Sequence, residues 1–337
     1  MKTQMTERFP GISCAWMNAE GKITTEYYGT ADRESNIPVD ENTMFPACSI
    51  SKFITALCVM KLREQKRIDT DKPVNDYLKG WKLLKTDGSG SSASIRSLLC
   101  HTGGILDGED AFYGLRRNDP EVTLTDILEG KTAYNNRPVR EEKPQGTAFE
   151  YSDAGYCVLQ LMLQEVTGKE YADLVREIIF EPLGLKNTFF ASPANVEAFE
   201  KTGRMAAGYD DQNRLIPGKY PRVPDLAASG LWSTPTDLAL IAKEFITALQ
   251  GRSGFLGKED AEEMAAPVEG FPWTGLGLFV EGDNTLASRG WGENGQCILK
   301  MKYDTEDISV VMTNRNPGMD QASSGVECLA DNRCCLN

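Results

Sequence analysis

The chain has 337 residues, of which 41% are hydrophobic and 25% charged, and its formal net charge is −13. This length allows one large domain or two interleaved ones. The acidic balance argues against binding to nucleic-acid phosphates. The sequence has no apolar run of about 18 residues, which argues against a membrane span. The single histidine excludes metal sites built from several histidines.

The N-terminal part predicts a β-hairpin followed by a helix. Residues 11–17 and 22–28 are β-prone runs separated by the turn residues 18–21. From residue 53 onward, apolar residues recur at spacings of three and four, which predicts a helix with a buried face. These residues are Phe53, Ile54, Leu57, Cys58 and Leu62.

The middle of the chain is predicted to be mostly helical. The pattern of caps and apolar residues predicts helices over 71–78, 94–100, 123–130, 153–167, 171–180 and 234–249. Residues 83–94 predict a surface loop, and residues 189–224 an irregular region rich in turn formers.

The C-terminal part of the chain is predicted to form two strands, over 297–303 and 308–313, followed by a helix over 319–330. Short links between strands imply antiparallel pairing, so we expect the two chain ends to build one sheet. The fold class is therefore α+β, with a sheet domain of residues 1–72 and 225–337 and a mainly helical domain of residues 73–224 inserted into it.

The nine cysteines, an odd number without Cys-x-x-Cys spacing, favour free thiols in a reducing compartment. The first ten residues lack the apolar core of a secretory signal. The expected location is therefore cytoplasmic, unless a leader has been removed.

The candidate nucleophile is Ser49, three residues before Lys52. Residues three apart share a helical face, so an amine at 52 could accept the serine proton, provided that burial depresses the lysine pKa. The alternative is structural, because serine is a favoured N-cap and Ser49 or Ser51 could fill that role. The pair alone is a weak signal.

Three further stretches strengthen the catalytic reading of the Ser49–Lys52 pair. They are residues 97–105 with His101-Thr102-Gly103-Gly104, residues 146–156 with Tyr151-Ser152-Asp153, and residues 229–238. In this order, and with residues 180–185, they resemble the serine β-lactamase and penicillin-binding-protein-like hydrolases, in the branch of class C β-lactamases, D-aminopeptidases and esterases. The resemblance runs from about residue 12 to 317. It implies an antiparallel sheet flanked by helices, an inserted helical domain and a cleft between them.

The resemblance also implies roles for three residues. Ser49 would attack a carbonyl to form an acyl-enzyme, and Lys52 and Tyr151 would share proton transfer. An ammonium favours the phenolate form of a nearby tyrosine, which can then act as a general base. His101 matches a structural residue of the family near the cleft, and as a hydrogen-bonded turn residue it is the less expected base.

At the position where the family has asparagine, this chain has Asp153. A carboxylate only accepts hydrogen bonds, whereas an amide also donates. Two readings stay open: Asp153 binds an amine or guanidinium of the substrate, or it pairs with Lys52 or caps the helix that it opens.

The third family motif, a basic residue followed two positions later by glycine, falls on Arg289-Gly290-Trp291. Arg289 would hold a substrate carboxylate, and Trp291 would crowd the strand along which substrate lies. Reading Glu293-Asn294-Gly295 as the motif is the second choice. In the first register the oxyanion hole would use the backbone N–H groups of Ser49 and Gly292.

The expected function is an acyl-enzyme serine hydrolase for small esters or amides, of the esterase, D-amino-acid peptidase or weak β-lactamase type. Its partner is a small-molecule or peptide-like substrate, and no metal or cofactor is implied. A fold of this kind hosts several activities, so the substrate is not selected by it. The alternative is a non-catalytic penicillin-binding-like sensor or binding protein on the same scaffold. The sequence does not indicate an oligomeric state.

Overall fold

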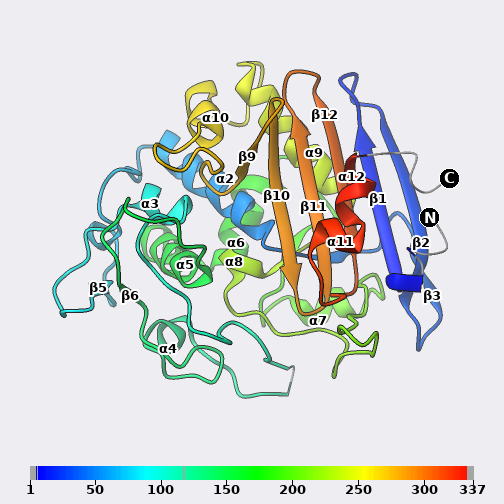
Figure 1. Ribbon diagram of the computed structural model, residues 1–337, viewed down its shortest axis with the longest axis horizontal. Coiled ribbons are helices and arrows are strands. Elements are labelled where there is room, and N and C mark those ends of the chain that lie inside the picture. The colour runs from blue at the N-terminus through cyan, green and yellow to red at the C-terminus, as the bar shows by residue number, and fades with distance from the viewer. Residues whose placement is uncertain (1–4, 6, 117, 332–337) are drawn as a thin grey trace.

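A seven-stranded antiparallel sheet dominates one side of the molecule (Figure 1) in the computed structural model, which describes residues 5, 7–116 and 118–331. The strand order is β3-β2-β1-β12-β11-β10-β9. The strands are β1 Gly11–Met17, β2 Ile23–Asp32, β3 Ile37–Pro38, β9 Phe279–Glu281, β10 Thr285–Gly292, β11 Gly295–Lys302 and β12 Asp307–Thr313.

The two ends of the chain meet in this sheet. Strand β1 pairs with β2 in a hairpin and with β12 on its other side, with Ile12 opposite Thr313 and Met17 opposite Ile308. The predicted hairpin, the two C-terminal strands and their union in one sheet are therefore confirmed. The three-residue strand β9 was not predicted, because it is too short to show an alternating pattern.

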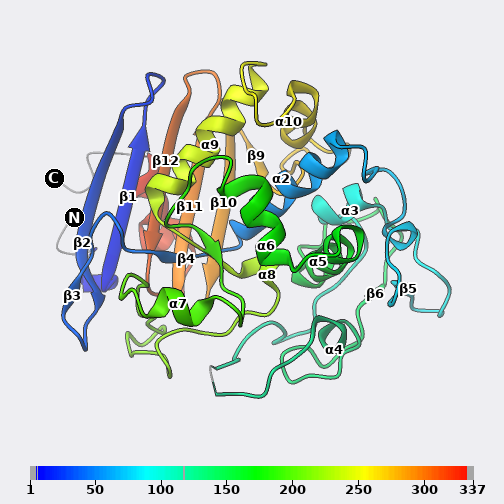
Figure 2. The ribbon, with the colours of Figure 1, turned by 180° about the vertical axis from the view of Figure 1, so that it is seen from behind.

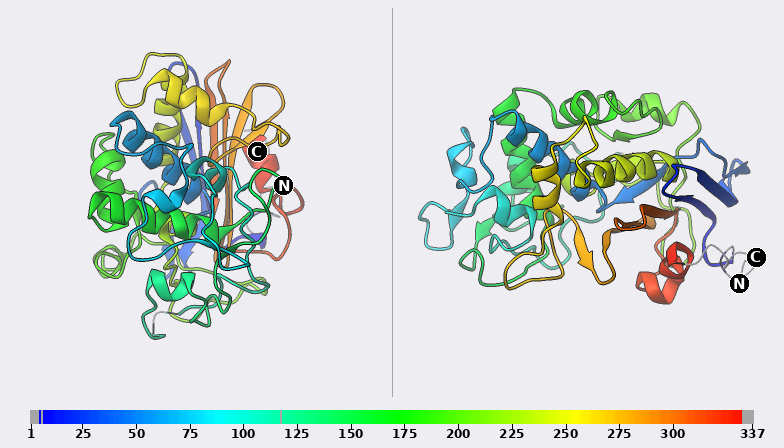
Figure 3. Two further views of the ribbon diagram at one scale, coloured as in Figure 1. Left: turned by 90° about the vertical axis from the view of Figure 1, so that its left-hand side faces the viewer. Right: turned by 90° about the horizontal axis from the view of Figure 1, so that it is seen from above.

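Helices cover both faces of the sheet (Figure 3). On one face lie α9 Pro235–Leu249 and α2 Ser51–Glu64, and on the other α11 Gln321–Ser324 and α12 Val326–Asp331. Ile12, Cys14 and Trp16 alternate toward the α12 side, where they form a small core with Val326 and Leu329. The predicted single helix over 319–330 is wrong, since Gly325 has φ 91° and divides it into α11 and α12.

The helical part lies beyond the β9–β10 edge of the sheet (Figure 2). Its long helix α5 has the predicted bounds, Asp153–Thr167, because the Ser152 hydroxyl caps its start and Gly168 ends it in the left-handed conformation. The other helices are η1 Val74–Asp76, α3 Ile95–Leu99, α4 Leu124–Leu128, α6 Tyr171–Val175, η2 Arg176–Phe180, α7 Val196–Glu200, α8 Leu226–Ser229 and α10 Lys258–Ala265.

Two predicted segments contain more structure, or a different structure, than expected. The helix over 171–180 changes at residue 176 from α6 to the wider π-turns of η2. The predicted surface loop over 83–94 contains β5 Leu84–Lys85, which pairs in parallel with β6 Arg140–Glu141 to form a second, two-stranded sheet. A third, three-stranded sheet has the order β4-β8-β7, with β4 Phe45–Cys48, β7 Phe189–Phe190 and β8 Leu231–Ser233.

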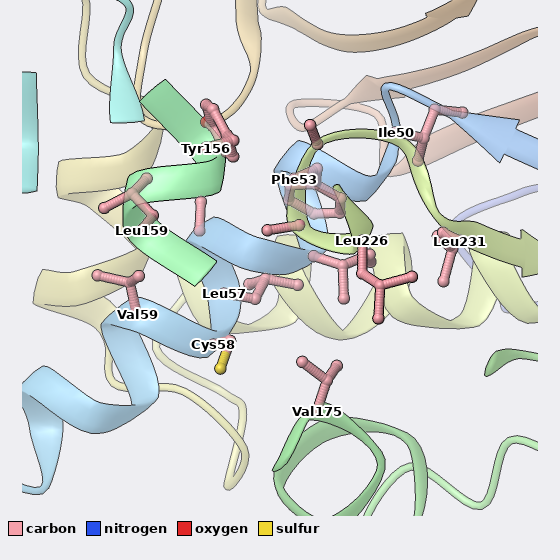
Figure 4. Close-up of a cluster of buried hydrophobic side chains, with 14 of the residues drawn as sticks. Ile50, Phe53, Leu57, Cys58, Val59, Tyr156, Leu159, Val175, Leu226 and Leu231 are labelled. Carbon is pink, nitrogen blue, oxygen red and sulfur yellow. The ribbon is translucent and has the colours of Figure 1, made fainter. Parts of the chain in front are cut away.

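Helix α2 runs through the centre of the molecule, between the sheet and the helical part. Its Phe53 and Leu57 pack with Tyr156 and Leu159 of α5 and with Leu226 of α8 in one buried cluster (Figure 4). A helix that is buried almost all round belongs to the core of a large domain. Its buried polar residues Ser51, Lys52 and Thr55 must therefore find partners inside the protein.

Cys14, Cys48, Cys58, Cys100, Cys157 and Cys297 are buried free thiols, and Cys334 and Cys335 lie outside the described residues. None of the described helices is long and apolar enough to span a bilayer. The division into domains of residues 1–72 with 225–337 and 73–224 stays a prediction.

Candidate active site

Ser49 lies in the sharp connection between β4 and α2. The residue before it, Cys48, has φ 48°, a left-handed conformation that a non-glycine residue adopts at a cost. The Ser51 hydroxyl stabilises this connection by donating to the Cys48 carbonyl at 2.6 Å and accepting the Leu231 N–H at 3.0 Å. Ile50 is the N-cap of α2 and no side chain caps the helix. The hydroxyl of Ser49 is therefore not used as a cap.

Lys52 projects from the first turn of α2 and is almost completely buried, with 3% of its side chain exposed. Its ammonium donates to the Ser49 Oγ at 3.1 Å, to the Asp153 Oδ1 at 2.6 Å and to the Ala228 carbonyl at 3.1 Å. These three acceptors match the three donors of an ammonium group. The amine is thus held in one position beside the candidate nucleophile.

The charge state of Lys52 follows from its surroundings. Burial favours the neutral amine, but the Asp153 carboxylate and the Tyr151 phenol outweigh it, and the net effect raises the lysine pKa. The depressed pKa that a lysine base requires is therefore not supported by this geometry. Lys52 is instead a fixed positive charge next to the Ser49 oxygen.

Tyr151 shares a pocket with Ser49, Lys52 and His101, which is also lined by Ser288 of β10. The Lys52 ammonium lies 4.7 Å from the centre of the Tyr151 ring. Although 41% of Tyr151 is exposed, its phenolic end lies among protein atoms, and this desolvation raises the pKa of the phenol, while the Lys52 charge and interactions with Lys52 and Ser49 lower it by less. The resting group is therefore a neutral phenol close to a cation that favours its ionised form.

His101 supports the tyrosine. Its Nδ1 accepts the Ser152 N–H at 3.1 Å, and its ring stacks on Tyr151 with centroids 4.2 Å apart. Burial first, and then the charge of Lys52, place the histidine pKa well below its ordinary value. The ring is thus a neutral, hydrogen-bonded turn residue, as the sequence predicted, and its own φ of 61° lies in the left-handed region.

Asp153 is the first residue of α5, and its carboxylate pairs with Lys52. Of the two readings that the sequence left open, this contact favours the pairing, and Ser152 rather than Asp153 caps the helix. Asp107, which sequence reasoning missed, accepts the backbone N–H groups of Asp153 at 2.7 Å and Ala154 at 3.0 Å. No local pattern around Asp107 indicates this long-range contact.

The end of β10 passes close to the segment that precedes Ser49. A Cβ on Gly290 would lie 2.3 Å from the Ala47 carbonyl oxygen, and one on Gly292 would lie 2.9 Å from the Cys48 Sγ. Only glycine allows this approach. Gly292 is therefore close to Cys48, the residue before the candidate nucleophile, and its role in an oxyanion hole with the Ser49 N–H stays a prediction.

The two predicted substrate-binding residues of β10 lie at different pockets, and Arg289 lines the pocket of Ser49 and Tyr151. The Arg289 guanidinium pairs with Glu281 at 2.7 Å and with Glu327 of α12 at 2.5 Å. Its charge is thus already neutralised by two carboxylates, which weighs against its binding a substrate carboxylate. Trp291 is 45% exposed and lines a second pocket.

This second pocket, here called the aromatic pocket, adjoins the nucleophile through Cys48, Asp153 and Gly292. Its wall contains five aromatic side chains, namely Phe112, Tyr113, Tyr134, Trp232 and Trp291. The described residues contain no group of three or more His, Cys, Asp or Glu side chains placed to hold a metal ion.

Comparison with known proteins gives a consistent result. The protein-family model described as Beta-lactamase matches residues 1–325. The chain is 28% identical over 244 residues to teichoic acid D-alanine hydrolase of Staphylococcus aureus, covering 72% of this chain and 54% of that protein. It is also 28% identical over 222 residues to unguisins hydrolase of Aspergillus violaceofuscus, covering 64% of this chain and 37% of that protein. The chain thus spans about half or less of these relatives.

Among solved structures, the octameric penicillin-binding protein homologue from Pyrococcus abyssi has a TM-score of 0.78 and 25% identity, covering 97% of this chain and 74% of that one. The D-amino acid amidase from Ochrobactrum anthropi has a TM-score of 0.78 and 21% identity, covering 98% and 97%. The latter likeness concerns the fold, which is that of the β-lactamase and transpeptidase proteins.

Proposed function

The chain belongs to the β-lactamase family, and from this premise we propose that it is a serine hydrolase that forms an acyl-enzyme on Ser49. The observation that carries the proposal is the contact of the Ser49 hydroxyl with the buried Lys52 ammonium at 3.1 Å, in one pocket with Tyr151. The proposed substrates are small esters or amides, including D-amino-acid derivatives. Relatives named as D-alanine hydrolase and D-amino acid amidase support this class.

In the proposed mechanism Tyr151 is the general base. Its phenolate, stabilised by Lys52, takes the proton of Ser49 as the serine oxygen attacks the carbonyl. The N–H groups of Ser49 and Gly292 bind the developing oxyanion, which contributes several kcal/mol to the stability of the transition state. The tyrosine then gives the proton to the leaving group, and water hydrolyses the acyl-enzyme by the same route.

The pairing of Lys52 with Asp153 supports this division of roles. An ammonium held by a carboxylate at 2.6 Å does not readily give up its proton, so it acts as a charge rather than as a base. The other candidate base, His101, uses its Nδ1 to accept the Ser152 N–H. The phenol of Tyr151 is therefore the proton acceptor that the geometry favours.

The first prediction is that a fluorophosphonate probe adds to Ser49 alone. Intact-mass measurement should show one adduct, located on Ser49 by peptide mapping and absent in Ser49→Ala. Cys48→Ala is the matched control and should keep the adduct, because the neighbouring thiol is 3% exposed and plays no part in the proposed chemistry.

The wild-type protein and Ser49→Ala can also be incubated with p-nitrophenyl esters, D-amino-acid amides and benzylpenicillin to identify the acyl donors. Hydrolysis of an ester or amide that Ser49→Ala abolishes is the expected result. Failure of the wild-type protein to form an adduct with any of these compounds would favour the non-catalytic binding protein instead.

A further inference from the structure

The aromatic pocket and the pocket of Ser49, Tyr151 and His101 share no lining residue. The aromatic pocket reaches the site through Cys48, the residue before Ser49, and through Gly292, the predicted oxyanion donor. A group attached to the carbonyl that Ser49 attacks could therefore extend into it. The pocket is open, since Tyr113 is 56% exposed and Trp291 45% exposed.

Two exposed aromatic side chains in the wall of one pocket need an explanation. Large apolar groups exposed together on a soluble protein commonly mark a binding site. The hydroxyl of Tyr134 is turned to the buried Asp225, to which it donates at 2.6 Å, and the Tyr134 ring packs edge-on against Phe112. The Tyr134 ring thus contributes carbon surface to the pocket, since its hydroxyl is used by Asp225.

The charged residues in the described wall already have partners. Asp153 is held by Lys52, and Glu293 is paired with Arg116 at 2.8 Å. Arg222 donates to the backbone carbonyls of Asp119 and Pro120. The two carboxylates of the wall are therefore already paired, and Arg222 keeps its positive charge while it is held by backbone carbonyls. Aromatic surface beside paired carboxylates suits a flat, apolar group rather than a cation.

One side of this pocket is a loop, residues 106–116, which contacts the hairpin of β10 and β11 through Glu293. Glu293, in the turn between β10 and β11, accepts the Gly114 N–H at 2.6 Å and pairs with Arg116. The carboxylate thus ties this loop to the hairpin that carries Trp291 and Gly292. The loop is strained, because Phe112 has φ 66°, which a bulky residue rarely adopts. Such a loop needs fixed contacts to keep its position.

We propose that Glu293 is a specificity-determining residue, which clamps Tyr113 and Trp291 around a subsite for a flat apolar group, such as a phenyl ring, on the acyl part of the substrate. This inference rests on the proposed hydrolase function and extends it to a substrate class. Glu293 acts through the loop and is a positioning residue. Trp291 and Tyr113 contact the ligand.

The second prediction concerns the ratio of kcat/KM for p-nitrophenyl phenylacetate to that for p-nitrophenyl acetate. We expect Trp291→Ala and Tyr113→Ala each to lower this ratio about tenfold, through KM for the phenylacetyl ester. Glu293→Gln should lower it severalfold, because the amide loses the ion pair with Arg116. Trp273→Ala is the control: this tryptophan is 47% exposed but packs against Phe149 and Phe271, outside the pocket wall, and its loss should leave the ratio unchanged.

A binding measurement separates this inference from the hydrolase proposal. In the Ser49→Ala background, phenylacetamide should receive saturation transfer by NMR and acetamide should not, and Trp291→Ala should abolish the signal. Phenylacetamide binding without any Ser49 adduct would overturn the hydrolase proposal alone. An unchanged ester ratio in Trp291→Ala and Tyr113→Ala, or no phenylacetamide binding, would overturn the subsite, and an unchanged ratio in Glu293→Gln would overturn the clamp.

Discussion

Tyr151→Phe should lower kcat/KM for a small ester by about 10²–10⁴, the range that loss of a general base produces. The substitution removes only the phenolic oxygen that we propose takes the Ser49 proton, and it keeps the ring that stacks on His101 and faces the Lys52 ammonium. We therefore expect a loss of rate without a loss of stability. The measurements are steady-state kinetics and thermal unfolding.

Two variants complete this experiment. Tyr303→Phe removes a phenolic oxygen that donates to Asn284 at the surface, and it should leave the rate unchanged. His101→Asn keeps a hydrogen-bond acceptor for the Ser152 N–H and should retain most of the activity. If His101→Asn abolished ester turnover and Tyr151→Phe spared it, the histidine would be the base and the proposed role of Tyr151 would be wrong.

Asp153→Asn should destabilise the protein by about 3 kcal/mol, because removing one partner of a buried ion pair leaves the other charge without compensation. Lys52 would keep the Ser49 hydroxyl, the Ala228 carbonyl and a neutral amide as hydrogen-bond acceptors, but no carboxylate to pair with. Denaturant unfolding measures the loss. Asp173→Asn, which breaks an exposed ion pair with Arg176, should change stability by less than about 0.5 kcal/mol.

The difference in unfolding free energy between wild type and Asp153→Asn should depend on pH because the pKa of Lys52 is raised in the folded protein. A lysine pKa that is higher in the folded state contributes stability that is fully present below the unfolded value of about 10.4. It is lost as the pH rises through the folded value. The difference between wild type and Asp153→Asn should therefore be constant near neutral pH and shrink above about pH 10. A difference that grew with alkaline pH would contradict the assignment of Lys52 as a cation.

The same variant should shift the activity profile. Burial raises the pKa of Tyr151, Lys52 lowers it and Asp153 adds to the increase, so removing the carboxylate should lower this pKa. If Tyr151 must ionise to act as a base, kcat/KM rises with pH, and in Asp153→Asn this rise should occur at lower pH. A profile that moved to higher pH would count against a phenolate base.

Local signals predicted those parts of the fold that short-range contacts define. Helix α5 has its predicted bounds because Ser152 and Gly168 act within one turn of its ends. The hairpin of β1 and β2 follows from turn residues between two β-prone runs. The prediction of one helix over 319–330 was wrong at Gly325. The left-handed conformation of this glycine ends α11, although the apolar pattern continues past it.

The candidate site was predictable for a different reason. Ser49, Lys52 and Tyr151 lie in short motifs whose order along the chain indicates the family, and the family model matches residues 1–325. Asp107 and the Ala228 carbonyl carry no such motif, and the contacts of Glu293 with Gly114 and Arg116 do not follow from the motif considered at residues 293–295. Each acts on residues far away in sequence, and a contact of this kind leaves no periodic or capping pattern near the residue that makes it.

The sequence by itself determined the α+β architecture and the family, and it put forward Ser49, Lys52 and Tyr151 as the candidate reactive side chains, because these depend on residue type and local order. The tertiary structure decided their charge states and surroundings. Whether Lys52 is an amine or an ammonium depends on the carboxylate that faces it, and that carboxylate comes from Asp153, 101 positions away. Burial and the distance between charges set a pKa, and both exist only once the chain has folded.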